Sequence, residues 1–526
     1  MGIKQYSRTK NTILNLASSV VGHSLMLLMN FAVRTVFIHT LGKSYLGIDG
    51  LFANILQMLS LAELGVGHAI LFKLYDPIAR EDHARIAVLM KFYKTMYRFI
   101  GVAVLLLGAG LIPFLPSLIR DYDKLARLNI NAALIFALYL SRSVSSYLFF
   151  AYKSAIISAN QKEYIVTLVG NTFTILFDVV KMVVLVFVRR FEVYVGVSIF
   201  SAIAQNYVCA RIAGRLYPYI NTKTDDRISR AEFIETLKDC GALMLYKLNN
   251  VVLKATDNIV LSAYLGLESV AMYSNYYLFY TTLSNFILRL FNAVAHSLGN
   301  LHTTSNRKHE YEVFEIIMLV CAILGGTAGV GIAAVSDELV LNWIGAEWVL
   351  AAPVAILIGV EVFSLPYKSA FAKYRSAMGL FQQAKYRPLA GMIVNLVVSI
   401  ALVRVWGIAG VLMGTILADW TTVLWYDPIV IHRNGFENVA SVSQYYKNFL
   451  LNLSVIVCVG VVDVALCRRL FTEWGWLSVL LHTAICGVTV PSALLLVYAR
   501  KQEGRYILTM ARKASGKLFR RGSRFS

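Results

Sequence analysis

The chain has 526 residues, of which 58% are hydrophobic and 15% are charged, and it carries a formal net charge of +20 at pH 7. Uncharged apolar stretches occur at residues 101–119, 316–336 and 474–499. Each is about as long as, or longer than, the helix of roughly 20 residues that crosses a hydrocarbon core about 30 Å thick. This pattern excludes a soluble globular protein. Only helices or a closed barrel satisfy the backbone inside a bilayer, and the sequence lacks the alternation of barrel strands, so it predicts an all-α polytopic membrane protein.

Hydropathy and turn-forming residues together predict about fourteen membrane-spanning helices. Several of these helices contain one or two charged residues, so their assignment depends on the turns as well as on hydropathy. In chain order, the predicted helices cover residues 12–38, 45–72, 96–119, 127–150, 163–186, 192–214, 240–262, 270–299, 311–335, 348–372, 387–404, 407–427, 447–467 and 474–499.

The distribution of Lys and Arg gives the predicted orientation, because basic residues accumulate on the cytoplasmic side. With the N-terminus inside, about 34 of the 50 basic residues fall in cytoplasmic tails and loops, against about 9 outside. The number of helices is therefore predicted to be even, with both termini in the cytoplasm. The longer aqueous segments, at residues 73–94, 215–239, 428–446 and in the tail, are expected on that side.

The net positive charge predicts anionic membrane lipids as partners, because each basic residue near their headgroups gains about 1 kcal/mol. Nucleic acid is not an expected partner. Residues 1–10 are polar and run directly into a full-length span, so no cleavable signal is expected. The six cysteines show no CxxC spacing and support neither a disulfide nor a metal site. No cofactor is expected.

The outer loops are predicted to be short, about ten residues each, so none is large enough to fold on its own. A membrane-embedded glycan polymerase or ligase, which usually carries a large outer loop, is therefore a weaker alternative than a transporter. The glycine-rich residues 325–331 lie within a span, where close helix packing explains them better than phosphate binding.

Two similar turns indicate an internal repeat. Leu41 and Gly42 precede the second predicted helix, and Leu265 and Gly266 precede the eighth in a similar local pattern, 224 residues later. The same offset relates Asn171 to Asn395. We expect two parallel six-helix lobes at residues 1–222 and 223–436, two further helices at 437–500 and a basic cytoplasmic tail at 501–526. Parallel repeats of this kind are a known transporter plan, with the substrate path between the lobes.

Four segments carry a resemblance to a known family: YLGIDGLF at residues 45–52, LSLAELGVG at 59–67, MGLFQQAKYRP at 378–388 and GIAGVLMGT at 407–415. They resemble the polysaccharide transporter (Wzx-type) flippases of the multidrug/oligosaccharidyl-lipid/polysaccharide (MOP) exporter superfamily. The resemblance covers nearly the whole chain, but its motifs are structural turns and identify no substrate.

The resemblance implies a V-shaped, MATE-like fold whose cavity is lined largely by the first, second, seventh and eighth helices. It implies a protein that is not an enzyme and that flips undecaprenyl-diphosphate-linked oligosaccharides from the inner to the outer leaflet of the bacterial cytoplasmic membrane. Flipping would occur by alternating access, and the flipped oligosaccharide would supply capsular, exopolysaccharide or other surface glycan assembly. Glycan assembly proteins would be further partners. A multidrug antiporter or a peptidoglycan lipid-precursor flippase of the same superfamily stays an alternative.

Ionisable residues inside spans are costly and usually face a cavity or a partner. Asp178 with Lys181, and Lys254 with Asp257, stand three residues apart and are expected to pair locally. Lys368 and Asp463 are expected near helix ends. The predicted set within spans is Arg34, Glu63, Arg142, Asp178, Lys181, Lys247, Lys254, Asp257, Arg289, Glu361, Lys368, Asp419 and Asp463.

Four of the cations have no acid one helical turn away. At 1.5 Å per residue, Arg142 and Arg289 are predicted to lie roughly 22 Å and 28 Å from the outer ends of their helices, and Lys247 roughly 10 Å from an inner end. Because forked guanidinium donors match phosphate oxygens, we expect Arg142, Lys247 and Arg289 to bind the substrate diphosphate and Arg34 to hold it nearer the outer edge. The alternative is pairing across helices, for example of Glu63 with Arg142.

Tyrosines recur along the eighth predicted helix, where their rings and hydroxyls would suit a sugar path; an interfacial aromatic belt is the alternative. The predicted sugar-path residues are Tyr273, Asn275, Tyr276, Tyr277 and Tyr280.

Carboxylates inside the spans are the candidates for proton or sodium coupling, if transport is coupled. Glu63 is the first choice, because Gly65 and Gly67 are expected to loosen the helix around it. Asp257 and Asp178 are the further candidates.

Overall fold

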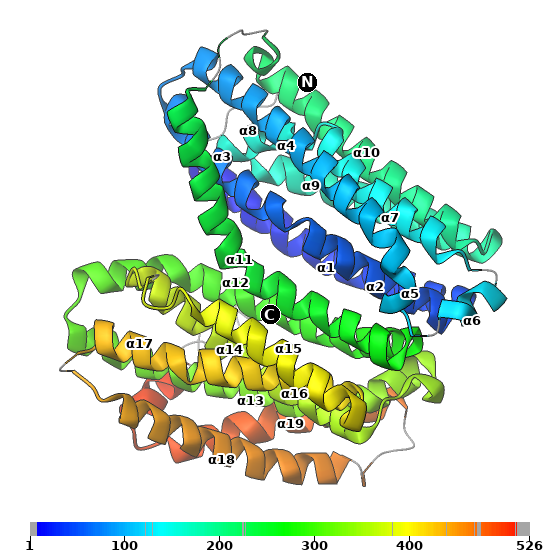
Figure 1. Ribbon diagram of the computed structural model, residues 1–526. Coiled ribbons are helices and arrows are strands. Elements are labelled where there is room, and N and C mark those ends of the chain that lie inside the picture. The colour runs from blue at the N-terminus through cyan, green and yellow to red at the C-terminus, as the bar shows by residue number, and fades with distance from the viewer. Residues whose placement is uncertain are drawn as a thin grey trace, which may run out of the picture. The chain divides into compact units, whose positions relative to one another are not determined.

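The computed structural model describes residues 8–510 and residue 512, apart from residues 121, 129, 223–225, 227, 381, 438, 468, 471–474 and 511. Side chains are described except at residues 8–24, 61–65, 68, 69, 126, 239, 241–254 and 296. Every regular element in this described part is helical, which confirms the all-α prediction (Figure 1). Contacts divide the chain into two compact units, Met1–Ala271 and Met272–Ser526.

In the first unit, α1 packs against α9, α4 against α7, α9 against α10, and α11 against α2 and α3. Three short 3-10 turns connect helices at Ile112–Phe114, Ala151–Lys153 and Pro218–Asn221. The helices of this unit are α1 (Arg8–Leu41), α2 (Lys43–Leu59), α3 (Leu61–Ala79), α4 (His83–Leu111), α5 (Leu115–Leu118), α6 (Tyr122–Arg127), α7 (Ala132–Leu148), α8 (Ser154–Ala159), α9 (Glu163–Phe187), α10 (Phe191–Leu216) and α11 (Arg230–Leu265).

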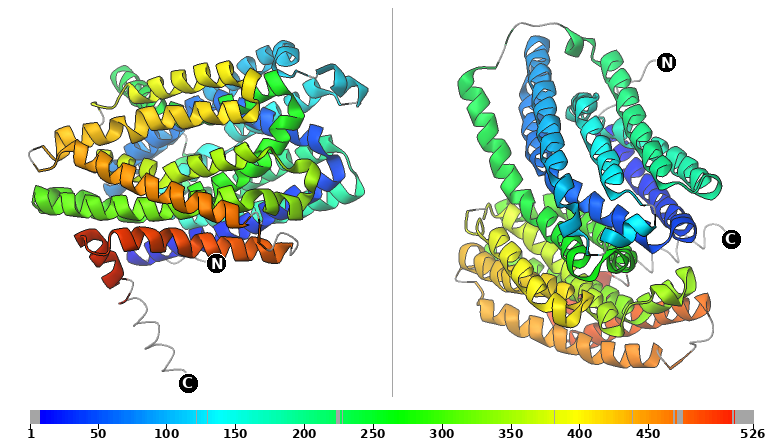
Figure 2. Two further views of the ribbon diagram at one scale, coloured as in Figure 1. Left: turned by 90° about the horizontal axis from the view of Figure 1, so that it is seen from below. Right: turned by 45° about the vertical axis from the view of Figure 1, so that its right-hand side comes forward.

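The second unit begins within α12 (Leu267–Thr304). In it, α13 packs against α14, α18 and α19, and α16 packs against α14 and α15 (Figures 1 and 2). Its other helices are α13 (Arg307–Ile344), α14 (Ala352–Ala377), α15 (Arg387–Trp406), α16 (Ile408–Asp419), α17 (Tyr426–Gly435), α18 (Val442–Cys467) and α19 (Trp476–Val497), with a 3-10 turn at Ala346–Trp348 and a π-helical turn at Trp420–Leu424.

Each of the fourteen predicted spans coincides with one helix or with a broken helix. Among the described residues, nine helices are long and apolar enough to cross a membrane, and a tenth span is the pair Ala132–Leu148 and Ala151–Ala159, bent by 43°. The chain is thus a multi-pass membrane protein, and the count of fourteen spans stays a prediction.

Two predicted spans differ from the structure in form. The second breaks at Ser60, which separates α2 from α3, whereas α3 runs unbroken past Gly65 and Gly67, so the loosening expected at those glycines is wrong. The span predicted at 407–427 continues through the π-helical turn into α17 and ends at Gly435.

Much of the sequence predicted as cytoplasmic loop is helical. α3 extends to Ala79, and α4 begins directly after Asp82, whose side chain accepts a hydrogen bond from the Arg85 backbone N–H (2.9 Å). α11 begins after Ser229, which caps the Glu232 backbone N–H in the same way (3.1 Å). Because such polar caps satisfy the free N–H groups of a first turn, these helices extend past the apolar residues that hydropathy detects.

Small residues let neighbouring helices approach closely. A Cβ atom added at Gly359 of α14 would lie 2.5 Å from the Gly329 carbonyl oxygen of α13, and one added at Gly414 of α16 would lie 2.1 Å from the Ser399 hydroxyl of α15. Real side chains do not fit at such distances. Gly325, Gly326, Gly329, Gly410 and Gly414 therefore serve helix packing, as predicted, whereas Gly331 has open space around it and Gly407 forms the turn before α16.

The turns of the predicted repeat share one backbone conformation. Gly42 between α1 and α2 has φ 79° and ψ −169°, and Gly266 between α11 and α12 has φ 92° and ψ 174°. Positive φ of this kind suits glycine and few other residues. The contacts group α11 with the first unit, whereas the repeat places it first in the second lobe; the lobe boundaries stay a prediction.

Candidate substrate-binding site

Five helices of the first unit bring charged and tyrosine side chains together. We call this group the first-unit polar cluster; its members are Arg34 on α1, Asp49 on α2, Tyr139 and Arg142 on α7, Asp178 and Lys181 on α9, and Tyr194 on α10.

The cluster forms because its members lie at similar depths in antiparallel helices. Arg34 is seven residues before the end of α1, Asp49 six residues after the start of α2, and Lys181 six residues before the end of α9. At 1.5 Å per residue, all three are about 9–11 Å from the same end of the unit. That end would face outward if the N-terminus is cytoplasmic.

The predicted depth of Arg142 is wrong. Residues 122–127 form the separate helix α6, and α7 begins only after Asn131, whose side chain accepts a hydrogen bond from the Leu134 backbone N–H (3.0 Å). Arg142 is therefore ten residues, or about 15 Å, from the start of its helix, rather than roughly 22 Å. This places it closer to the depth of Arg34 than predicted.

Direct contacts connect the carboxylates of the cluster to donors. The Tyr139 hydroxyl donates a hydrogen bond to Asp49. Lys181 Nζ lies 3.0 Å from Asp178 Oδ1, which confirms the predicted local pair, and it also lies 5.6 Å from the centre of the Tyr194 ring. Because Asp178 and Lys181 have side-chain exposures of only 7% and 14%, this pair is largely removed from solvent.

The arginines complete the electrostatics of the cluster. Arg34 interacts with Asp49 and Tyr194, and Arg142 interacts with Tyr139 and Tyr194. Three cations thus face two carboxylates, which leaves one positive charge in excess. Arg142 is exposed, whereas Tyr139 is buried. A surplus cation on the accessible side of a buried hydrogen-bonded network is chemically suited to bind an anionic group.

Packing of aromatic rings fixes the cluster from one side. Phe191, the first residue of α10, contacts the rings of Phe37, Tyr139 and Tyr194 with centroid distances of 5.7, 6.3 and 5.9 Å. Phe191 is fully buried. These contacts orient the Tyr139 and Tyr194 side chains that surround the charged groups.

The other predicted diphosphate ligands lie on α11 and α12. Arg289 is exposed on α12, 22 residues or about 33 Å from the start of that helix, somewhat deeper than the 28 Å predicted. Lys247 lies on α11, and its side chain is outside the described residues. α11 begins at Arg230, ten residues before the predicted span, and the depth of Lys247 in the membrane stays a prediction.

The candidates for ion coupling lie on three different helices. The Glu63 backbone is in the first turn of α3, directly after the break at Ser60, and its side chain is outside the described residues, as is that of Lys254. Asp257 on α11 is 4% exposed. Asp178 belongs to the first-unit polar cluster.

The predicted sugar-path residues are mostly buried. Tyr273, Asn275, Tyr276 and Tyr280 are at most 3% exposed, and Tyr277 is half-buried. The Tyr276 hydroxyl donates to Asp337 Oδ1 (2.7 Å) and accepts from the Leu350 backbone N–H (3.1 Å). Tyr276 therefore connects α12 to α13 and to the following loop, which is a structural role.

Four further in-span charges lie in the second unit. Lys368 on α14 forms an ion pair with Asp419 on α16 and lies nine residues before the end of its helix, so its expected place near a helix end is wrong. Glu361 accepts a hydrogen bond from Tyr280. Asp463 on α18 is buried and accepts from the Thr489 hydroxyl of α19 (2.5 Å).

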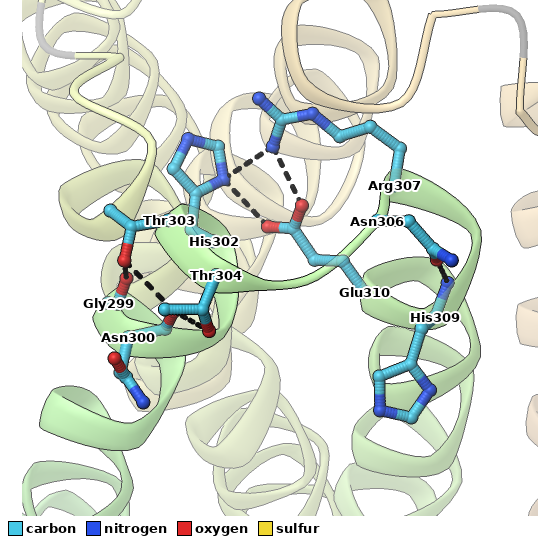
Figure 3. A network of polar contacts seen from close by, with 9 residues as sticks. All are labelled: Gly299, Asn300, His302, Thr303, Thr304, Asn306, Arg307, His309 and Glu310. Atoms are coloured by element: carbon cyan, nitrogen blue, oxygen red, sulfur yellow. Dashed lines mark hydrogen bonds and ion pairs between the residues drawn. The ribbon is translucent and has the colours of Figure 1, made fainter.

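A polar network closes the turn between α12 and α13 (Figure 3). Glu310 is 1% exposed; its Oε1 lies 2.8 Å from His302 Nδ1, and its Oε2 accepts from Arg307 Nη1 (2.8 Å). Asn306 caps α13 by accepting from the His309 backbone N–H (2.8 Å). The network holds the two helix ends together and is separate from the first-unit polar cluster.

Sequence reasoning missed Asp49, Tyr139 and Tyr194. Asp49 lies in the YLGIDGLF segment but near the predicted helix end, and it was not counted among the in-span charges. Tyrosines 139 and 194 lie in the fourth and sixth predicted spans among apolar residues. A useful signal is that Asp49, Arg34 and Tyr139 lie at similar depths, when depth is the number of residues from each to the nearest end of its helix.

The comparisons with known proteins agree with this architecture. A family model described as "Polysaccharide biosynthesis protein" matches residues 168–353. A structure of the lipid II flippase MurJ in an inward closed conformation matches 92% of this chain and 99% of its own, with a TM-score of 0.66 and 13% identity. An inward-facing MATE-family multidrug transporter of the MOP superfamily matches 80% of this chain and 95% of its own, with a TM-score of 0.62 and 14% identity. No curated protein sequence matches the chain.

These findings show that the chain is a multi-pass membrane protein with the fold shared by MurJ and the MATE transporters. The family match, at residues 168–353, agrees with the resemblance that the sequence motifs carry. The structural neighbours of the chain are transporters and flippases rather than enzymes.

Proposed function

We propose that the chain flips an undecaprenyl-diphosphate-linked oligosaccharide from the inner to the outer leaflet of a bacterial cytoplasmic membrane. The product would supply capsular, exopolysaccharide or other surface glycan assembly, and the two lobes would work by alternating access with both chain termini in the cytoplasm. The observation that carries the proposal is the surplus positive charge of the first-unit polar cluster. One of its members, Arg142, has an exposed guanidinium group.

The physical argument concerns the charge of the cargo. A lipid-linked diphosphate carries its negative charge through a region where unpaired charge is costly. Guanidinium groups present several donors in a fixed fork that matches phosphate oxygens. Arg34 is held within the cluster by its interactions with Asp49 and Tyr194, so Arg142 is the group with more freedom to bind the diphosphate. The lipid II flippase among the structural neighbours supports a lipid-linked cargo.

The direct test is flipping by the purified chain in proteoliposomes that contain a fluorescent undecaprenyl-diphosphate oligosaccharide. Arg142→Gln and Arg34→Gln together should lower the initial flipping rate about tenfold or more, because one charge-assisted contact contributes about 1.5–3 kcal/mol. Arg211→Gln is the matched control, since Arg211 is exposed on α10 of the same unit and donates to Tyr207. An unchanged rate in the double variant would eliminate the proposed role of the cluster.

A second pair of variants tests the remaining predicted ligand. Arg142→Gln combined with Arg289→Gln should reduce flipping more than Arg142→Gln alone if both arginines meet the diphosphate during the cycle. The same liposomes with the peptidoglycan lipid precursor, or with a cationic dye, test the two alternative cargoes. Faster movement of the dye than of the diphosphate lipid, insensitive to Arg142→Gln, would favour a multidrug antiporter.

A further inference from the structure

A small cavity with several polar lining residues lies in the second unit. It measures about 20 Å³ and lies between α13, α14, α18 and the segment that follows α19. A cavity of that volume holds one water-sized particle. Among its lining residues are Glu315, Tyr367, Tyr445, Asn452, Tyr498 and Glu503.

Several buried oxygen atoms line this cavity. The Tyr367, Tyr445 and Tyr498 hydroxyls and Asn452 Oδ1 have no well-formed hydrogen bond within the part of the chain that the structure describes. The Asn452 amide lies near the hydroxyls of Tyr367 and Tyr498. All four residues are at most 4% exposed. Unsatisfied polar groups at this depth cost free energy, so Asn452 Oδ1 and the Tyr445 hydroxyl, which have no other contact of this kind among the described residues, favour an occupant.

The charge around the cavity is negative. Glu315 of α13 and Glu503 each line it and interact with one another electrostatically. One ammonium group lies close: Lys501 Nζ donates to Asn448 Oδ1 (3.3 Å) and lies 4.6 Å from the centre of the Tyr498 ring. Two carboxylates beside one ammonium leave a deficit of one positive charge.

The Tyr498 hydroxyl, which lines the cavity, is neutral at physiological pH. Burial above all, and then the charge of Glu503, raise the pKa of Tyr498 to about 12. Its oxygen therefore offers lone pairs, as does the carbonyl oxygen of Asn452. Carboxylate, carbonyl and hydroxyl oxygens are hard ligands, which bind hard cations rather than transition metals.

We propose that this cavity binds one alkali-metal cation, Na⁺ or K⁺, through Asn452 Oδ1, the tyrosine hydroxyls and the carboxylates of Glu315 and Glu503. A monovalent ion matches the deficit of one charge and the volume of one water molecule. The bound ion connects α13, α14 and α18 to the segment after α19, and so fixes the last two helices to the rest of the unit. The site is independent of the proposed cargo.

The test uses the full-length chain in detergent micelles. The midpoint of thermal unfolding is measured while NaCl or KCl replaces N-methyl-D-glucamine chloride at constant ionic strength, and the binding of radioactive ²²Na⁺ or ⁸⁶Rb⁺ is measured directly. We expect a saturable rise in the midpoint and one bound cation per chain, and the two salts identify which ion is preferred. Equal midpoints in all three salts, or no saturable binding, would overturn the proposal and leave the cavity to water.

Variants place the effect at this cavity. Glu315→Gln should weaken cation binding by about tenfold or more, because it removes a charged ligand. Asn452→Leu removes a neutral ligand and should also weaken binding. Asn452→Asp adds a charge without changing the volume and should tighten binding. It serves as the second variant if Asn452→Leu does not fold. Glu347→Gln removes an exposed carboxylate beyond the other end of α13 and should leave binding unchanged. Saturable binding that is insensitive to both Glu315 and Asn452 would belong to another site and would refute the assignment.

Discussion

Asp427 gives the sharpest stability prediction, because it is fully buried between two arginines of the second unit. Its Oδ2 lies 3.3 Å from Arg375 Nε and 3.1 Å from Arg387 Nη1. The arginine side chains are themselves only 9% and 12% exposed. These residues connect α14, the start of α15 and α17. Arg387 belongs to the MGLFQQAKYRP segment, so this part of the motif has a structural function.

Replacing Asp427 with Asn removes the only negative charge of this triad without changing its volume. At a separation near 3.2 Å and an effective dielectric constant of about 20, each contact contributes roughly 5 kcal/mol of gross attraction. The cost of removing all three charges from water offsets most of it. In Asp427→Asn the two buried arginines still carry the cost of removal from water, but they lose the attraction to the carboxylate. The free energy of unfolding should therefore fall by about 3–5 kcal/mol.

The assay is thermal or denaturant unfolding of the purified chain, followed by intrinsic fluorescence. Glu437→Gln is the control, since Glu437 is an exposed acid ten residues further along the chain, and it should change the free energy by less than about 0.5 kcal/mol. Replacing the whole triad with apolar residues, Asp427→Leu with Arg375→Met and Arg387→Met, should restore most of the loss. If Asp427→Asn is as stable as the parent chain, the arginines are neutralised by other groups and the reasoning is wrong.

Two further predictions concern contacts between helices. Gly359→Ala should lower the free energy of unfolding by about 1–3 kcal/mol, because its Cβ would lie 2.5 Å from the Gly329 carbonyl oxygen. Gly331→Ala on α13, where a Cβ meets no atom within 4 Å, is the control. Equal stability of the two variants would contradict the close approach. Tyr139→Phe should lower the free energy of unfolding by about 1–3 kcal/mol, because it removes the hydrogen-bond donor to Asp49. Tyr207→Phe, at an exposed position of α10, is the control and should be close to neutral. A neutral Tyr139→Phe in the same unfolding assay would show that Asp49 does not need that donor.

Features set by the bilayer or by short sequence spacing could be predicted from the sequence. The positions of the helices follow from hydropathy, because only helices of sufficient length satisfy the backbone in lipid. The pair of Asp178 and Lys181 follows from a spacing of three residues on one helix. The glycine turns at Gly42 and Gly266 follow from a repeated local pattern.

Features that depend on which helices become neighbours could not be predicted. The contact between Asp49 and Tyr139 joins residues 90 positions apart, and the ion pair of Lys368 with Asp419 joins residues 51 positions apart. The break at Ser60 contains neither Gly nor Pro, so no local signal marks it. The misplaced depth of Arg142 came from counting residues 127–131 as part of α7, although Asn131 caps that helix.

Accessibility, more than charge, distinguishes the site that would meet an anionic cargo. The Arg375–Asp427–Arg387 triad and the first-unit polar cluster each have one positive charge in excess. In the triad both guanidinium groups are buried against a single carboxylate, so a diphosphate could reach them only if the helices separated. In the cluster the acids are already engaged by Tyr139 and Lys181, while Arg142 is exposed. A transporter must release its cargo as well as bind it, and an exposed guanidinium at the edge of a satisfied network can exchange a phosphate for water without leaving a buried charge behind.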